Sequence, residues 1–192
     1  MLPIIQQPSN RQTHSGATWH VLVVASIVIV AALARLIPHS PNVTPITAMA
    51  LFGGAYFSSR RLAIAVPLIA MLISDLLLGF HPAMPFVYAS LILVSTLGMW
   101  IQKRKSARFI VGASLLASVA FFVVSNFGFW LTMGIYPISL VGLASCYAAA
   151  IPFFRDALAA DLFFTCCLFG GFELATRIAA LRLKPNAVRV RR

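Results

Sequence analysis

The chain has 192 residues, of which 60% are hydrophobic and only 10% charged, and its mean hydropathy is +0.92. A soluble domain carries about 25% charged residues, so the composition excludes an ordinary soluble protein. The net charge of +11 would suggest a nucleic-acid partner in a soluble chain. Here the basic residues flank apolar runs, which is typical of membrane topology signals, and we expect a lipid bilayer and no nucleic acid as partner.

The apolar runs define one membrane domain. Because about 20 apolar residues cross a bilayer, the chain holds material for roughly six spans and little else. We predict an all-α, polytopic membrane protein with a six-helix domain over residues 19–183. Residues 1–18 are polar, and we expect a disordered cytoplasmic tail there. Residues 184–192 are rich in basic residues, and we expect them to form a basic cytoplasmic tail.

The first apolar run extends from Trp19 to Ile37. It is long enough for a first span, and Trp19 suits an interfacial anchor. The alternative is a secretory signal peptide, with Arg11 as a thin basic region and the small residues ALA at 32–34 as a cleavage site. The length of the run favours the span.

Three prolines then interrupt the apolar sequence within residues 35–54, which read RLIPHSPNVTPITAMALFGG. Proline removes backbone donors and disfavours helix in the residue before it. Irregular backbone at membrane depth must be buried in protein or face water. We interpret the stretch as a stiff loop between two helices. It is either a plain connector or, because it carries His39, Asn42 and Thr44, the lip of a binding site.

Four further runs give the second to fifth spans. The second is short, and the third contains Pro67 and Asp75. A turn with His81 follows the third span, and a basic segment at 103–108 follows the fourth. The expected limits are residues 46–58, 62–80, 86–101, and 109 to about 124 or as far as Trp130.

The segment 125–156 is apolar but broken by glycines and prolines. Its longest uninterrupted piece, residues 139–151, is shorter than a span and has the length of an interfacial or re-entrant helix. We expect this piece to form a short separate helix on the outer face. The last run, residues 157–183, is long enough to be the sixth span.

Basic residues set the orientation. With six spans, Arg60, Arg61, the 103–108 segment and the basic C-terminal tail share the side of the N-terminus. Cytoplasmic loops carry the excess of lysine and arginine. If residues 139–151 crossed the membrane, the C-terminal tail would lie opposite the 103–108 segment. We therefore expect a multi-pass protein of the bacterial cytoplasmic (inner) membrane with both termini in the cytoplasm.

This topology places a set of polar side chains near the outer side. Ionisable residues inside spans are costly and face a cavity or a partner. We predict that Arg35, Asp75 and Asp161 line one outward-facing cavity, capped by residues 38–45 and 126–136. The alternative is a structural pairing of the aspartates with Arg35 or Arg155. The predicted substrate-binding residues are Arg35, His39, Asn42, Thr44, Asp75, His81, Asn126, Trp130, Tyr136, Tyr147, Arg155 and Asp161.

Three of these residues are aromatic: Trp130, Tyr136 and Tyr147. They form either an interfacial aromatic belt or a surface that stacks on a flat ligand. Glu173 and Arg177 stand four apart on the last run, the favoured spacing of a structural helical pair.

Catalytic signatures are missing from the sequence. It contains no G-x-S-x-G, H-E-x-x-H or G-x-x-x-x-G-K-[ST] motif, so we expect neither an enzyme nor ATP hydrolysis. His39 and His81 could meet Asp75 at a metal ion, but the spacing does not require it, and we expect no metal and no cofactor. The three cysteines lack a C-x-x-C pair and are expected to be inert packing residues.

Over about residues 20–180 the chain resembles a family of small bacterial membrane proteins, transport proteins without an assigned substrate. The stretches that carry the resemblance are ARLIPHSPNVTPITAMALFGGAYF, VPLIAMLISDLLLGFHP, NFGFWL and CYAAAIPFFRDALAADLFF. That family is similar to the substrate-binding (S) components of energy-coupling-factor (ECF) transporters. S components often carry an Ala-x-x-x-Ala pattern on the first helix, which WHVLVVASIVIV lacks.

The resemblance implies a six-helix protein that captures a vitamin or similar micronutrient from outside. Such a protein docks on a separate membrane scaffold with two ATPase subunits and rotates to deliver its cargo. A second function remains open: a structural or assembly protein with the same fold, as in cell-shape proteins of the MreD type. A filled, mostly apolar outer cavity would favour assembly, and a pocket lined by Arg35, Asp75 and Asp161 would favour transport.

Overall fold

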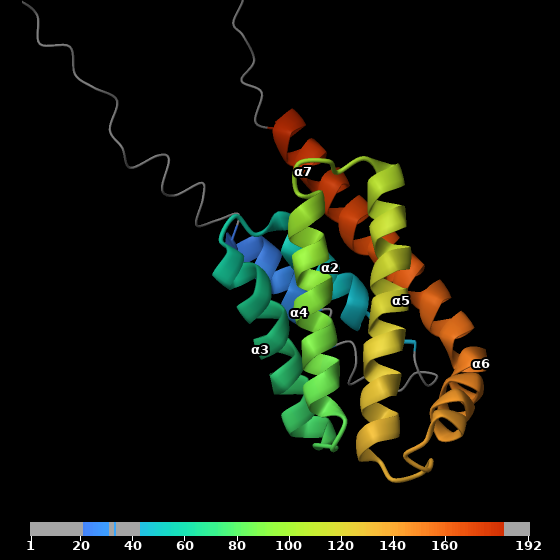
Figure 1. Ribbon diagram of the computed structural model, residues 1–192. Coiled ribbons are helices and arrows are strands. Elements are labelled where there is room, and N and C mark those ends of the chain that lie inside the picture. The colour runs from blue at the N-terminus through green and yellow to red at the C-terminus, as the bar shows by residue number, and fades with distance from the viewer. Residues whose placement is uncertain (1–20, 31–32, 34–42, 183–192) are drawn as a thin grey trace, which may run out of the picture.

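The apolar runs fold into helices, as backbone polar groups in a membrane must be hydrogen-bonded within the protein. A computed structural model of the chain describes residues 21–30, 33 and 43–182 (Figure 1). In this part of the chain there is no strand, so the predicted all-α class is confirmed there. The helices are Val21–Val30, α2 (Ile46–Tyr56), α3 (Arg60–Leu78), α4 (Met84–Ile101), α5 (Ala107–Thr132), α6 (Leu140–Thr165), the π-helix η2 (Cys166–Gly170) and α7 (Gly171–Arg182).

Four helices are long and apolar enough to cross a membrane, which agrees with a multi-pass membrane protein. They are α3, α4, α5 and a 42-residue run, Leu140–Leu181, that joins α6 to α7. The predicted third to fifth spans correspond to α3, α4 and α5, although α5 extends to Thr132. The first two predicted spans correspond to the shorter helices Val21–Val30 and α2. The two predicted tails lie outside the described residues.

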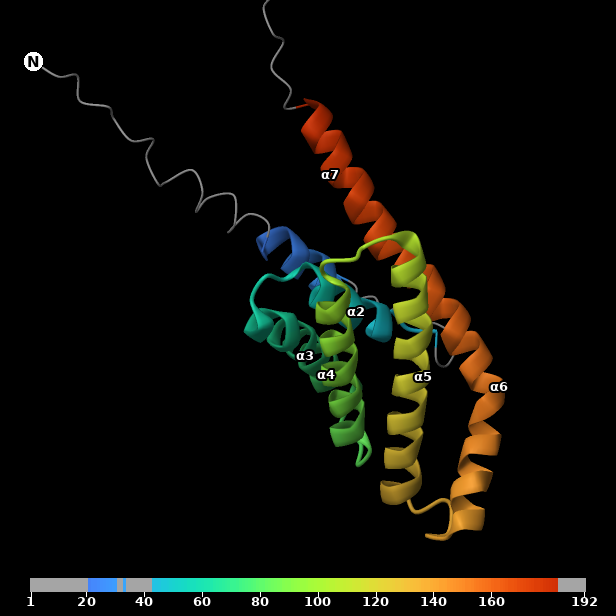
Figure 2. The same ribbon diagram turned by 45° about the horizontal axis from the view of Figure 1, so that its top comes forward.

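The short separate helix predicted at residues 139–151 is the first part of α6. The Ser139 side chain accepts a hydrogen bond from the Gly142 amide, and the helix then continues through Pro152 to Thr165. Proline removes one backbone hydrogen bond, but helices in membranes tolerate such a loss when neighbouring groups compensate for it. The run bends within α6 instead of ending (Figures 1 and 2). At 1.5 Å per residue it is about 63 Å long, so it must tilt or extend beyond a hydrocarbon core of about 30 Å.

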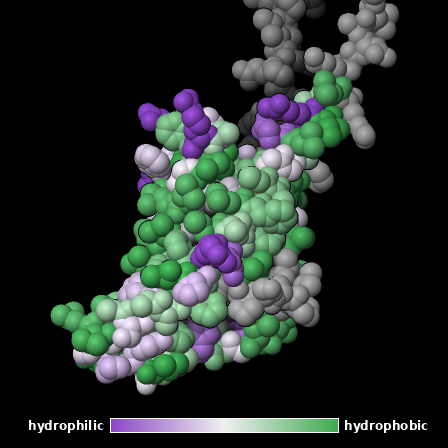
Figure 3. Space-filling view, turned by 90° about the vertical axis from the view of Figure 1, so that its right-hand side faces the viewer, coloured by the Kyte–Doolittle hydropathy of each residue, from purple (hydrophilic) through white to green (hydrophobic). Residues whose placement is uncertain are grey.

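The two ends of the helix bundle differ in charge. The α2–α3 and α4–α5 connections and α7 lie at one end, and the α3–α4 and α5–α6 connections lie at the other (Figure 1). The first end holds Arg60, Arg61 and the basic segment 103–108, whereas residues 79–83 and 133–139 at the other end contain no lysine or arginine. Figure 3 shows a largely hydrophobic surface with strongly hydrophilic side chains at the upper end and a further hydrophilic group near the middle of this face. We refer to these ends as the basic end and the uncharged end.

Helix α2 lies at the centre of the bundle. All its residues from Ile46 to Ala55 are buried, as expected of a helix that is apolar all round. It packs against α3, α4, α5 and α6. Val24 and Val28 of the first described helix, both fully buried, belong to the same core.

The contact between α2 and α4 is a crossing of two backbones. A Cβ on Gly54 would collide with the Ser95 carbonyl oxygen and lie 2.9 Å from the Gly98 Cα. A Cβ on Gly98 would collide with the Leu51 carbonyl oxygen. Only glycine therefore fits at both positions, and the pair sets the distance between the helices, as small residues do in membrane bundles.

The basic end of α2 is held by side chains. Gln102, just after α4, donates hydrogen bonds from Nε2 to the carbonyl oxygens of Gly54 (2.9 Å) and Phe57 (2.7 Å). These oxygens have no partner in the helix beyond its end, so the amide fulfils the role of a C-cap. The end of α2 is thereby tied to the end of α4.

Aromatic rings join the same end of α2 to the last helix. Phe52 lies edge-on to Phe169 with ring centroids 5.3 Å apart, and Tyr56 lies 4.4 Å from Phe172. The π-helix η2 contains Phe169 and directly precedes the turn with Phe172. A π-turn inserts one extra residue per turn and so changes which side chains face a neighbour. Both phenylalanines reach α2 in this way.

The short length of α2 leaves space at the uncharged end. Eleven residues rise about 16 Å, roughly half the hydrocarbon thickness of about 30 Å. The basic half of the bundle interior is therefore filled by a buried helix, and the other half is not.

Replacing Gly54 with alanine is expected to destabilise the protein, because the new Cβ must push α2 away from α4. Overpacking of this kind costs roughly 1–3 kcal/mol. Thermal unfolding of the purified protein in detergent measures the change. The matched control is Gly112→Ala on α5, where a Cβ meets nothing within 4 Å. Equal unfolding temperatures for Gly54→Ala and the unmodified protein would contradict the crossing.

Candidate ligand-binding cavity

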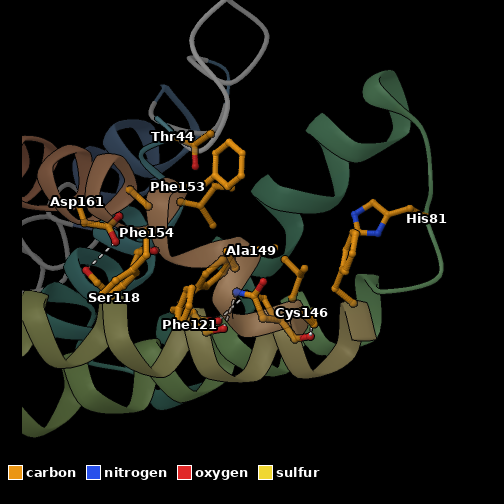
Figure 4. A pocket seen from close by; sticks show the side chains of 18 of the residues that line it. Thr44, His81, Ser118, Phe121, Cys146, Ala149, Phe153, Phe154 and Asp161 are labelled. Carbon is orange, nitrogen blue, oxygen red and sulfur yellow. Dashed lines mark hydrogen bonds between the residues drawn. The ribbon is translucent and has the colours of Figure 1, made fainter. Parts of the chain in front are cut away.

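A cavity of about 490 Å³ lies at the uncharged end of the bundle, beyond the start of α2 (Figure 4). This volume falls within the range of roughly 300–1,000 Å³ of small-molecule sites. Its lining residues come from α2 to α6 and the connections beside them. They are Thr44, Ile46, Thr47, Met71, His81, Val87, Ser118, Phe121, Phe122, Ser125, Asn126, Phe129, Tyr136, Cys146, Ala149, Ala150, Phe153, Phe154, Ala157 and Asp161.

Two helices supply most of this lining, each through one face. Residues three or four apart lie on the same side of a helix. The lining residues of α5 follow this spacing: Ser118, Phe121, Phe122, Ser125, Asn126 and Phe129. The lining residues of α6 do the same: Cys146, Ala149, Ala150, Phe153, Phe154, Ala157 and Asp161. The cavity is the space between these two faces and the start of α2.

The walls combine aromatic rings with alanines. Phe122 of α5 lies 4.5 Å from Phe154 of α6, measured between ring centroids. Ala149 and Ala150 occupy the same face of α6 one turn earlier. The aromatic rings fill one part of the gap between α5 and α6. Because alanine has the smallest side chain after glycine, the alanines leave another part of this gap open.

The carboxylate in the described lining belongs to Asp161, which is 5% exposed. Ser118 Oγ lies 2.7 Å from its Oδ2 and 2.9 Å from the Ser114 carbonyl oxygen. A hydroxyl has one hydrogen, so Ser118 donates to only one of these acceptors at a time. Thr47 of α2 also hydrogen-bonds the carboxylate. Within the described residues, Asp161 forms no ion pair.

The hydroxyl network continues from Asp161 toward the basic end. Ser114 Oγ and Thr165 Oγ1 lie 3.0 Å apart and both are buried. These groups join α5 to α6 below the cavity. The carboxylate is therefore held in place by hydroxyl groups on two sides while its outer face borders the cavity.

Five of the predicted substrate-binding residues line this cavity together: Thr44, His81, Asn126, Tyr136 and Asp161. His81 lies in the α3–α4 connection and is exposed. Figure 4 shows His81 and Asp161 toward opposite ends of the cavity, so the first marks its outer rim and the second its base.

Asp75, predicted to share this cavity, is not among its lining residues. It is 1% exposed and accepts a hydrogen bond of 2.8 Å from the Tyr88 hydroxyl. This contact joins α3 to α4. Sequence spacing could not separate Asp75 from Asp161, because each is an aspartate near the expected outer end of a predicted span, residues 62–80 and 157–183.

The remaining predicted residues lie elsewhere. Trp130 donates its indole N–H to the Pro137 carbonyl oxygen at 3.0 Å. Tyr147 donates its hydroxyl to the Val123 carbonyl oxygen at 2.6 Å, which joins α6 to α5. Arg155 is exposed and lies 3.8 Å from Asp156. Arg35, His39 and Asn42 lie outside the described residues.

The predicted helical pair of Glu173 and Arg177 is present, with Nε and Oε1 2.9 Å apart. Of the cysteines, Cys146 is buried against the cavity, and Cys166 and Cys167 are exposed and unbonded. In the described part of the chain, no three histidine, cysteine, aspartate or glutamate side chains lie close enough together to hold a metal ion.

The aromatic walls were missed in the sequence, although a signal for them exists. The phenylalanines of α5 and α6 were treated as general apolar residues of a span. Their spacing of three and four, shared with polar Ser118, Asn126 and Asp161, distinguishes one face of each helix. A face that mixes aromatic and polar side chains inside a membrane helix indicates a cavity.

Comparison with known proteins gives one match. A family model described as a family of unknown function (DUF6580) matches residues 16–183. No curated protein and no solved structure matches the chain.

Exchanging each buried aspartate for asparagine should separate their roles. Asp75→Asn is expected to lower the unfolding temperature, because it alters a fully buried hydrogen-bonded group outside the cavity. Asp161→Asn is expected to leave the unfolding temperature unchanged or raise it, because a buried carboxylate without a cationic partner is costly. Thermal unfolding in detergent measures both. A lower unfolding temperature for Asp161→Asn than for Asp75→Asn would show that Asp161 is the structural group.

Proposed function

The chain belongs to the DUF6580 family of unknown function, and we propose that it is a transport component of the bacterial inner membrane. In this proposal the cavity captures a small micronutrient from the outer face of the membrane for uptake. The observation that carries the proposal is the position of the cavity. It has the volume of a small-molecule site and lies at the end of the bundle where the two described connections, residues 79–83 and 133–139, contain no lysine or arginine.

The orientation follows from charge. Cytoplasmic loops are enriched in lysine and arginine, so the basic end faces the cytoplasm and the cavity faces outward. We propose six membrane helices with both termini in the cytoplasm. The helix Val21–Val30 and α2 are two of the six, the second being short because it begins inside the bundle, beside the cavity. The first part of α6 then lies toward the outer face, where the 42-residue run exceeds the membrane thickness.

Energy for uptake must come from another protein in this proposal. The sequence has no nucleotide-binding motif. A membrane scaffold with two ATPase subunits, as the resemblance to ECF S components implies, would supply it. The chain itself would act as the substrate-binding subunit, with no catalytic step of its own.

An assembly protein of the MreD type needs no ligand and would fill its interior with side chains. The open cavity beside a buried carboxylate favours binding over this alternative. Small-molecule sites combine apolar walls with a few fixed polar groups, and both parts are present around Asp161.

Filling the cavity should abolish ligand retention. Ala150 lines the cavity, whereas Ala148 on the same helix is exposed and does not. Ala150→Trp is therefore expected to lose a small molecule that co-purifies with the unmodified protein, and Ala148→Trp should keep it. Mass spectrometry of the solvent extract of each purified protein provides the comparison. Identical extracts from the two variants, both folded, would contradict binding in this cavity.

Cysteine labelling tests the orientation. In a protein whose native cysteines are replaced by serine, Ile138→Cys places a thiol in the α5–α6 connection and Lys105→Cys places one in the α4–α5 connection. An impermeant maleimide added to intact cells should label the first site only. Labelling of both after the membrane is opened confirms that both thiols are reactive. Selective labelling of position 105 in intact cells would reverse the proposed orientation.

A further inference from the structure

We propose that the ligand of this cavity is an organic cation with an aromatic or apolar body, and that Asp161 is its counter-ion. This inference rests on the proposed function and specifies the class of substrate. It is carried by three features of the described lining: its charge, the environment of its carboxylate, and its aromatic walls.

The described lining of the cavity carries a negative charge, although the chain as a whole is positively charged. The whole chain carries +11, yet the described lining contains one carboxylate and no lysine or arginine. Of the basic residues in the described part, Arg60, Arg61 and the 103–108 segment lie at the basic end of the bundle, whereas Arg155 lies on α6 and is exposed outside the lining. An anionic ligand would meet the Asp161 carboxylate with no lysine or arginine in the described lining to offset it, and His81 lies at the opposite end of the cavity. A cationic ligand would neutralise the carboxylate.

The environment of Asp161 leaves room for such a partner. Hydroxyl groups of Ser118 and Thr47 hydrogen-bond the carboxylate, and the Ser118 hydrogen is shared with the Ser114 carbonyl oxygen. An ionised carboxylate has acceptor sites for about four hydrogen bonds. A ligand ammonium group with N–H bonds, or a quaternary ammonium without them, can therefore approach from the cavity side. In a membrane interior this interaction is little screened by water.

The aromatic walls of the cavity also favour a cationic ligand. Cations are attracted to the faces of aromatic rings within about 6 Å of the ring centroid. The lining contains five phenylalanines and one tyrosine: Phe121, Phe122, Phe129, Phe153, Phe154 and Tyr136. Figure 4 shows Phe154 beside Asp161, so ring and carboxylate border the same part of the cavity. The rings further out would contact the body of the ligand.

A charge series tests the inference on the unmodified full-length protein in detergent. Benzyltrimethylammonium, benzyl alcohol and benzoate share one aromatic ring and are positive, neutral and negative. The cation should raise the unfolding temperature and bind in calorimetric titration at least about tenfold more tightly than either other probe. Equal or tighter binding of benzyl alcohol or benzoate, or no preference for the cation, would overturn the inference.

Variants then assign the preference to one carboxylate. Asp161→Asn should weaken binding of the cation by about tenfold or more and leave binding of benzyl alcohol unchanged, and Asp161→Glu should retain the preference. Asp156→Asn is the matched control, since it removes an exposed carboxylate from the same helix. Unchanged cation binding in Asp161→Asn would contradict the role of this residue. The charge series decides the ligand class even if Asp161→Asn does not accumulate.

These outcomes are independent of the tryptophan comparison. Loss of the small molecule in Ala150→Trp, together with no preference for the cation, would leave the binding function intact and reject the cationic ligand. Identical behaviour of Ala150→Trp and Ala148→Trp would reject the binding function itself.

Discussion

The backbone contact between Gly54 and Gly98 is the constraint on which the rest of the bundle depends. It lets α2 pack against α4 without side chains between them, so a short helix can be buried on all sides. Gln102 and the aromatic rings of the last helix then fix its basic end. Because α2 rises only about half the membrane thickness, it fills the interior of the bundle at the basic end and leaves a cavity at the uncharged end.

The same geometry explains the chemistry of the cavity. The start of α2 brings Thr47 to Asp161, and α5 brings Ser118 to it. A buried carboxylate of this kind costs free energy in a membrane unless a partner or ligand balances it. The aromatic faces of α5 and α6 shield the group from lipid and water. Sites that are destabilising in isolation commonly serve binding, since their ligand supplies the missing interaction.

Sequence reasoning predicted the helical class and the grouping of Arg60, Arg61 and the 103–108 segment at one end of the bundle, because both follow from composition and from charge near apolar runs. It placed a break at Pro152, since a missing amide hydrogen usually ends a helix, whereas α6 continues through it. It also grouped Asp75 with Asp161. Which aspartate borders a cavity depends on the rotation of each helix about its own axis, which is not encoded locally. The spacing of phenylalanines on α5 and α6 carried usable information that charge alone did not.

The central claim is that the cavity at the uncharged end of the bundle is a ligand-binding site. A structure of the protein purified from its native membrane into lipid nanodiscs, at a resolution that shows side chains, tests it most directly. The account predicts density for a compact non-protein molecule between the aromatic faces of α5 and α6, with one group within contact distance of the Asp161 carboxylate. A cavity that is closed by side chains, or occupied only by a lipid acyl chain, would contradict the account.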